Sequence, residues 1–193
     1  MFLYSSCVFG KNNHTVALVR KKYIRINPNS EVQFMKIVIF ADSHREYQKL
    51  KNIVEKNLDA DLFIHLGDGE HELRDMEREH PDKKFVFVKG ECDYGVHDTE
   101  KVIDLNTCRI YCTHGNLHGL QSGLDSLIFD AKKNGCKIAL YGHTHFYRTE
   151  FIDGVYIMNP GSIDSPRGHN PASYGIIQID DSGKITMNIV ASR

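Results

Sequence analysis

The sequence contains no tryptophan, and it has only five prolines and five cysteines. It also lacks an apolar run near the roughly 18 residues that a membrane-spanning helix requires, which excludes an integral helical membrane protein. The five cysteines, at positions 7, 92, 108, 112 and 136, are odd in number and show no paired CxxC spacing. This pattern argues against a disulfide framework and a structural zinc site, and it predicts reduced thiols in the cytoplasm.

A strong excess of charge is absent as well, since the net charge is −1. Residues 1–34 carry +4, however, and the remainder carries −5, with 19 basic and 24 acidic side chains. Because contacts with nucleic-acid phosphates require clustered lysine and arginine, we expect no long nucleic acid as a partner. The first 34 residues also lack the apolar core of a signal peptide, so we expect neither secretion nor membrane attachment.

The length of 193 residues, with 41% hydrophobic and 25% charged side chains, is typical of one globular domain. We place this domain at residues 35–193, because Met35 directly precedes a strongly apolar segment. Residues 1–34 are then an extension without a catalytic role. The alternative is an added edge hairpin, or an arm through which the protein forms a homo-oligomer.

Strand-like and helix-like segments alternate from Lys36 onward. Short apolar runs predict buried strands at residues 36–40, 62–66 and 84–88, with helices between them at 45–57 and 70–80. This β-α-β-α-β order implies a parallel sheet. Hairpins are predicted for residues 101–105 with 109–113, 148–152 with 155–158, and 173–179 with 184–190, and a helix at 124–134 precedes a strand at 137–141. We therefore expect an α/β fold of two packed mixed β-sheets flanked by helices.

Side chains that can bind metals follow the ends of five predicted strands. They comprise three acids and four histidines: Asp42, His44, Asp68, Glu91, His114, His143 and His145. Open α/β sheets place their sites at the carboxyl ends of strands, so these side chains should converge on one rim. A mixed set of nitrogen and oxygen ligands suits manganese, iron or zinc better than calcium or magnesium.

The joint order of these motifs resembles the calcineurin-like metallophosphoesterase superfamily, whose pattern runs Asp-x-His, Gly-Asp, Gly-Asn-His-Asp, Gly-His and Gly-His-x-His. Within it the chain is similar to the small single-domain phosphodiesterase branch, to which a catalytically silent retromer subunit also belongs. Cys92 and the run Asn159-Pro160-Gly161-Ser162 are features of that branch. The resemblance covers residues 35 to about 190 and leaves residues 1–34 unexplained.

The resemblance implies a four-layer α-β-β-α sandwich that binds two divalent metal ions, with manganese favoured over zinc, iron or nickel. The first ion would be held by Asp42, His44 and His145, the second by Glu91, His114 and His143, with Asp68 shared between them. Catalytic roles would fall to Asp68 and His114, with Asp93 orienting a ligand. The implied reaction is hydrolysis of a small phosphodiester by a hydroxide that bridges the two ions.

Three positions depart from the general family pattern. Glu91 stands where the family has Asn, and Asn116 stands where many relatives have a second His. Cys92 replaces the family's catalytic His, which favours phosphodiesters with good leaving groups over simple alkyl monoesters; it could equally be a small filler beside the metals. These departures keep open a second hypothesis, an interaction module on the same fold with weak or no catalytic activity.

The remaining histidines, cysteines and one arginine are interpreted as structural or solvated. His65 lies within a strand and is expected to pack there or to support a ligand. Solvated positions are expected for His71, His80, His97 and His169, and core positions for Cys108, Cys112 and Cys136. Arg167 could reach a substrate phosphate, but a lone loop arginine is more often simply solvated.

Overall fold

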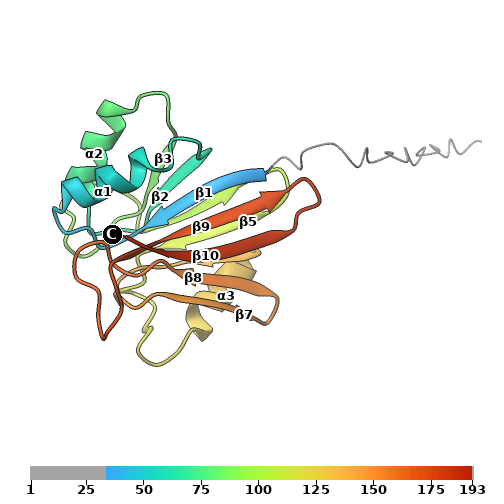
Figure 1. Cartoon of the computed structure of the whole chain (residues 1–193). Helices are drawn as coiled ribbons and strands as arrows, with labels where there is room; N and C mark the ends of the chain where they lie inside the picture. Colours follow the sequence, from blue (N-terminus) through green and yellow to red (C-terminus); the bar gives the residue numbers. More distant parts are fainter. Residues whose placement is uncertain (1–33, 193) are drawn as a thin grey trace, which may run out of the picture. The chain divides into compact units, whose positions relative to one another are not determined.

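The computed structural model describes residues 34–192, and the predictions for residues 1–33 lie outside this range. Within it, ten strands form two five-stranded sheets, accompanied by three helices. Helices α1 and α2 lie together beside β1, β2 and β3, whereas α3 lies at the opposite side of the molecule (Figure 1). The expected α/β fold with two packed mixed sheets is confirmed.

The first sheet has the strand order β10-β9-β1-β2-β3. Its strands are β1 (Phe34–Phe40), β2 (Leu62–His65), β3 (Phe85–Phe87), β9 (Ser173–Asp180) and β10 (Ile185–Ala191). The first three are parallel and are joined through α1 (Tyr47–Glu55) and α2 (Glu70–Glu79), as the β-α-β-α-β order predicts. Strand β9 runs antiparallel to both β1 and β10.

The second sheet has the strand order β4-β5-β6-β8-β7. It contains β4 (Glu100–Asp104), β5 (Arg109–Thr113), β6 (Ile138–Leu140), β7 (Arg148–Ile152) and β8 (Val155–Asn159), with α3 (Asp125–Lys133) between β5 and β6. The three central strands are parallel, and β4 and β7 pair antiparallel at the edges. Gly135 follows α3 with a φ of 67°, the left-handed conformation that commonly ends a helix.

Alternation along β1 shows how the layers stack. Ile37 and Ile39 belong to the core between the two sheets, whereas Val38 and Phe40 belong to the core beneath α1 and α2. A third core cluster includes Leu127 of α3 and residues of the second sheet. Because the central strands are buried on both faces, they read as continuous apolar runs in the sequence. The result is the four-layer α-β-β-α arrangement.

Several predicted boundaries shift by one or two residues, and two of these shifts have a clear local reason. Strand β1 begins at Phe34 rather than Lys36, because Phe34 and Met35 continue the antiparallel pairing with Asp180 and Ile179. Helix α1 begins at Tyr47 rather than at position 45, because Arg45 has a φ of 74° and a left-handed residue cannot start a right-handed helix.

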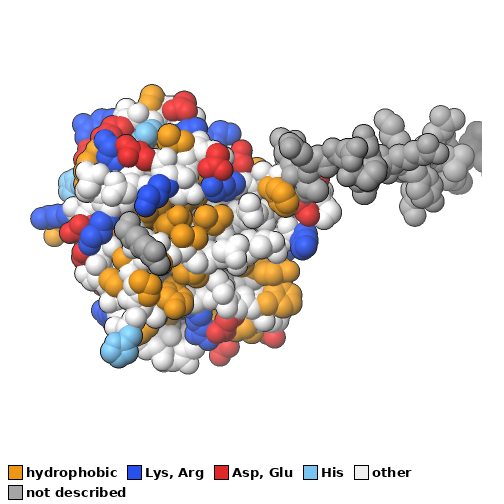
Figure 2. Space-filling model, viewed as in Figure 1, with side chains coloured by type: hydrophobic (Ala, Val, Ile, Leu, Met, Phe, Trp, Pro, Cys, Tyr) orange, Lys and Arg blue, Asp and Glu red, His pale blue; other side chains and the backbone are white. Residues whose placement is uncertain are grey.

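On the face shown in Figure 2, basic and acidic side chains are interspersed, and hydrophobic side chains gather near the centre. Among the helices of residues 34–192, none combines the length and the apolar character that crossing a membrane would need. The three cysteines assigned to the core are buried as predicted: Cys108, Cys112 and Cys136.

Candidate metal centre

The seven predicted ligands all lie just beyond the ends of parallel strands. Asp42 and His44 follow β1, Asp68 follows β2, and Glu91 follows β3. The second sheet contributes the other three histidines, His114 after β5 and His143 and His145 after β6. Because the two sheets pack face to face, side chains from both sheets meet at this edge.

Backbone strain is concentrated at the same residues. Seven non-glycine residues of the described chain have a positive φ, and five of them are predicted ligands: Asp42 (52°), His44 (42°), Asp68 (58°), His143 (63°) and His145 (60°). A left-handed conformation costs a non-glycine residue about 1–3 kcal/mol and persists only where the surroundings enforce it. Here it turns the chain sharply after β1, β2 and β6, so that the candidate ligand side chains face one another.

Asp42, His44 and His145 form the first ligand group, and one ligand atom of each lies within 4.8 Å of the others. The Nε2 atoms of the two histidines are 3.4 Å apart, and Nε2 of His145 is 3.3 Å from Oδ1 of Asp42. Nδ1–H of His145 donates to the carbonyl oxygen of Ser165 at 2.7 Å, which turns Nε2 toward the other ligands. The Asp42 carboxylate raises the pKa of His145, while burial opposes this effect.

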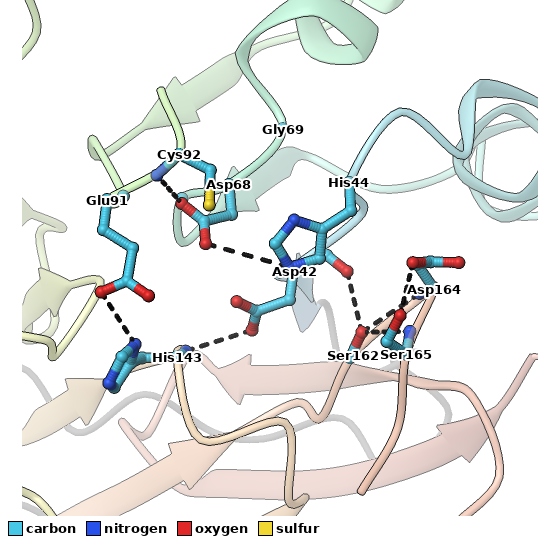
Figure 3. A network of polar contacts seen from close by, with 12 residues as sticks. Asp42, His44, Asp68, Gly69, Glu91, Cys92, His143, Ser162, Asp164 and Ser165 are labelled. Atoms are coloured by element: carbon cyan, nitrogen blue, oxygen red, sulfur yellow. Dashed lines mark hydrogen bonds and ion pairs between the residues drawn. The ribbon is translucent and has the colours of Figure 1, made fainter. Parts of the chain in front are cut away.

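Glu91, His114 and His143 form the second ligand group, again with ligand atoms within 4.8 Å. Oε2 of Glu91 is 3.5 Å from Nδ1 of His143, and the two side chains point toward each other in Figure 3. Nδ1–H of the fully buried His114 donates to the carbonyl oxygen of Leu66 at 2.7 Å. That hydrogen bond fixes the tautomer and leaves Nε2 of His114 with a free lone pair.

Asp68 lies between the two groups. Its Oδ2 atom is 3.5 Å from Nε2 of His114 and 3.9 Å from Nε2 of His44. Its other oxygen, Oδ1, accepts the backbone N–H of Cys92 at 2.8 Å, as Figure 3 shows. The carboxylate is therefore held so that one oxygen faces ligands of both groups.

Two buried atoms in this centre lack a hydrogen-bond partner, Oδ1 of Asp42 and Nε2 of His114. A buried polar atom without a partner costs about 1–3 kcal/mol, so such atoms need an explanation. Both are lone-pair donors at the rim where the other ligands converge. The donor set, with carboxylate oxygens and imidazole nitrogens in two groups that share Asp68, fits two divalent cations of the manganese, iron or zinc type.

Both carboxylate oxygens of Asp93 bind backbone N–H groups of the loop that contains Asp68 and of its neighbour at Gly90. Its two carboxylate oxygens accept the backbone N–H groups of Asp68, Gly69, Glu70 and Gly90 at 2.8–3.0 Å. Burial disfavours the charged carboxylate, but these N–H donors outweigh burial and hold the pKa of Asp93 below its usual value. The carboxylate caps the N-terminus of α2 and positions Asp68 at the same time.

The run Asn159-Pro160-Gly161-Ser162 ties the two sheets' ligand loops together. Nδ2 of Asn159 donates to the carbonyl oxygen of Gly142 at 2.8 Å and to Oγ1 of Thr144 at 3.0 Å, in the loop that carries His143 and His145. Oγ of Ser162 donates to the carbonyl oxygen of Asp42 at 2.8 Å (Figure 3). Both side chains are completely buried, so their hydrogen bonds are shielded from water.

His65 is completely buried, as the sequence indicated, and supports the Asp42 loop through Ser43. Its Nδ1 accepts the N–H of Gly67, so Nε2–H donates to Oγ of Ser43 at 2.9 Å, and Ser43 in turn donates to Glu72 at 2.8 Å. Burial lowers the pKa of His65 to about 4. The histidine is therefore neutral at physiological pH, which this hydrogen-bonding pattern requires.

Two histidines that were expected to be solvated are only partly exposed, His80 and His97. His97 contacts the buried Glu70 at 3.1 Å and packs edge-on against the ring of Phe87, and Nε2 of His80 is buried. Sequence reasoning also missed His118, a buried residue whose Nε2 lies 3.1 Å from the hydroxyl of Tyr111. His71 and His169 are exposed, as predicted. No pattern in the local sequence predicts the contacts of His97 and His118, because each contact joins a loop to another element.

Residues 35–182 match the profile of the calcineurin-like phosphoesterase superfamily domain. The chain belongs to this superfamily. The probable metallophosphoesterase YsnB of Bacillus subtilis is 33% identical over 150 residues, which cover 76% of this chain and 86% of that protein. Phosphodiesterase YfcE of Escherichia coli is 33% identical over 115 residues, or 54% of this chain and 58% of its own length. These matches confirm the predicted family and its class of activity, the hydrolysis of phosphoric esters.

Solved structures of the superfamily fold agree with the architecture. A predicted phosphoesterase from Streptococcus pneumoniae superposes with a TM-score of 0.73 at 26% identity, covering 84% of this chain and 92% of that one. Vacuolar Protein Sorting 29 from Cryptosporidium parvum superposes with a TM-score of 0.66 at 17% identity, covering 81% and 97%. At that identity the second likeness shows the fold alone.

Proposed function

We propose that this calcineurin-like phosphoesterase is a metal-dependent phosphodiesterase that hydrolyses a small phosphodiester. The observation that carries the proposal is the pair of ligand groups joined by Asp68, with partnerless buried donor atoms on Asp42 and His114. The phosphodiesterase YfcE, a relative over part of the chain, supports the choice of a diester.

Each side chain of the centre has a defined task in this proposal. Asp42, His44 and His145 would hold one divalent ion, and Glu91, His114 and His143 the other, with Asp68 shared. When bound, such ions polarise a phosphoryl oxygen and lower the pKa of a water molecule. Asp93 is a positioning residue, because both of its oxygens are engaged by the backbone that carries Asp68.

The finer points of the proposal concern the metal, the location and the assembly. Manganese is the metal we favour, because the ligand set mixes carboxylate and imidazole groups. The cytoplasm is the expected compartment, because the buried cysteines Cys108, Cys112 and Cys136 are free thiols. Association into a homo-oligomer stays a prediction attached to residues 1–34.

Replacement of the shared ligand tests the proposed function. Asp68→Ala should abolish manganese-dependent hydrolysis of bis(p-nitrophenyl) phosphate, because it removes the one carboxylate that faces both groups. The variant should also lose most of the increase in melting temperature that manganese gives the wild type, since metal binding stabilises the native state by mass action. The exposed His169→Ala serves as a matched control and should behave as wild type in both measurements.

The outcomes separate the two functional hypotheses. Wild-type turnover retained by Asp68→Ala would contradict the two-metal centre. Manganese-dependent stabilisation of the wild type without hydrolysis of any diester would instead favour the interaction module over the enzyme.

A further inference from the structure

A cavity of about 580 Å³ opens directly beside the proposed metal centre. His143 belongs to both the second ligand group and the cavity wall, so the two are continuous. The volume lies within the range of about 300–1,000 Å³ that is usual for small-molecule sites, and it exceeds what a phosphoryl group alone would fill. The cavity therefore has room for an organic substituent of the ester.

The cavity wall combines aromatic rings with hydrogen-bonding groups. Phe146 and Tyr147 line the cavity, and these large aromatic residues remain 47% and 40% exposed. Asn116 and Gln121 supply amide groups that can donate and accept hydrogen bonds. A flat ligand with apolar faces and a polar edge, such as a nucleobase, matches this combination, whereas an acyl chain or a glycerol unit would use only one part of it.

The loop that contains Gly168 packs against Phe146 in the cavity wall. Gly168 has a φ of 69°, and a Cβ atom built there would lie 3.0 Å from Cε1 of Phe146. The loop after Ser165 thus packs closely against the Phe146 ring. Contact with this loop restricts one side of the ring, while 47% of Phe146 remains exposed and available for a base to stack on it.

Arg167 supplies an unpaired positive charge at the same cavity. The residue is exposed and lines the cavity, and among the described residues no carboxylate forms an ion pair with it. Its backbone N–H donates to the carbonyl oxygen of His145 at 3.2 Å, which places Arg167 beside the first ligand group. By contrast, Arg148 is paired with Glu150. Arg167 is therefore the cation that can contact a phosphate lying between the first ligand group and the cavity.

We propose that this cavity binds the nucleoside part of a nucleotide ester, with the base against Phe146 and Tyr147 and the phosphate beside Arg167. That the bound nucleotide is a substrate rests on the proposed phosphodiesterase function.

Binding of two ligands that differ only in the base tests the proposal. We would measure the affinity of the manganese-loaded full chain for adenosine 5′-monophosphate and for ribose 5-phosphate by titration calorimetry. The wild type should bind the nucleotide at least about 5-fold more tightly, because stacking of a base on an aromatic side chain contributes to the affinity. Phe146→Ala and Tyr147→Ala should each remove most of that difference without changing the affinity for ribose 5-phosphate.

Two further variants make the test specific. Arg167→Gln should weaken both ligands by a similar factor, because it removes a contact to the phosphate that they share. Phe129→Ala, an exposed aromatic residue on α3 outside the cavity, should change neither affinity. Equal affinities of the wild type for the two ligands, or a base preference that survives in both aromatic variants, would overturn the proposal.

Hydrolysis is measured separately, so that the two proposals can fail independently. Thymidine 5′-p-nitrophenyl phosphate and methyl p-nitrophenyl phosphate share a leaving group and differ in the other substituent. If the enzyme hydrolyses both but Phe146→Ala lowers kcat/KM equally for the two, the nucleoside site is wrong and the phosphodiesterase stands. If neither is hydrolysed while the base-dependent binding is present, the phosphodiesterase is wrong and the nucleoside site stands.

Discussion

Glu91 is the residue at which the proposed centre departs from its family's pattern. Its side chain is half exposed and reaches His143 from the loop after β3. Unlike the neutral Asn expected there, it adds a negative charge, so a loaded centre is one charge less positive. A less positive centre binds cations more tightly but acidifies a bound water less.

Glu91→Asn should therefore weaken manganese binding and move the pH optimum of hydrolysis to lower values, with equal or higher kcat at saturating manganese. A pH–rate profile at several manganese concentrations, together with equilibrium dialysis of the metal, measures both effects. Glu77→Asn, a similar change at an exposed position of α2, is the control. If Glu91→Asn is inert at every manganese concentration while the wild type is active, this account of position 91 is wrong.

His65 gives a second prediction at this scale, on stability against pH. Its pKa is about 4 in the folded protein and near 6.5 when unfolded, so the unfolded chain takes up the proton first as the pH falls. The stabilisation of the folded state that depends on neutral His65 is fully present above about pH 6.5 and is lost toward pH 4. This loss lowers the free energy of unfolding by at most about 3 kcal/mol.

The comparison with His65→Gln, which keeps a donor for Ser43 and cannot titrate, isolates this contribution. Urea unfolding at pH 7.5, 6 and 5, with a chelator present to remove effects of metal release, gives the free energies. The wild type should lose more stability than the variant over this range. Parallel curves for the two proteins would show that His65 does not titrate as described.

At the scale of elements, the turn between β8 and β9 joins loops that come from different sheets. Asn159→Ala would leave the carbonyl of Gly142 and the hydroxyl of Thr144 without their shared donor. We expect a loss of about 1–3 kcal/mol in the free energy of unfolding. Manganese affinity should fall by roughly 10–100-fold, because the loop that carries His143 and His145 is no longer held.

Unfolding in urea and equilibrium dialysis of manganese check this prediction together. The exposed Asn188 on β10 offers a control, and Asn188→Ala should leave both quantities unchanged. A destabilised Asn159→Ala that still binds manganese with wild-type affinity would limit Asn159 to a structural role.

At the scale of the whole molecule, the question is whether the described domain is sufficient. A chain that starts at Met35 would lose from β1 only Phe34, a half-exposed residue that pairs with Asp180 at the end of the sheet. All seven proposed ligands remain. We expect this truncated protein to have the melting temperature of the full chain within a few degrees, and equal manganese-dependent hydrolysis. An insoluble or inactive product would contradict the assignment of residues 1–34 as a non-catalytic extension.

The sequence by itself determined the element order, the pairing of the hairpins and the set of candidate ligands. Each of these features depends on a short segment of the sequence. Buried strands are apolar runs, the two strands of a hairpin are separated by a few turn residues, and each candidate ligand follows directly after a strand. The start of α1 differed from the prediction, because Arg45 has a left-handed backbone that the local sequence does not indicate.

Only the tertiary structure decided how the ligands are held and what lies beside them. Ser162 contacts Asp42 across 120 positions of the chain, and His44 meets His145 across 101. The four N–H groups at Asp93, the partner of His97 and the cavity at Phe146 arise in the same way. Such contacts depend on how two sheets pack, and no periodicity within either segment encodes a partner so distant in sequence.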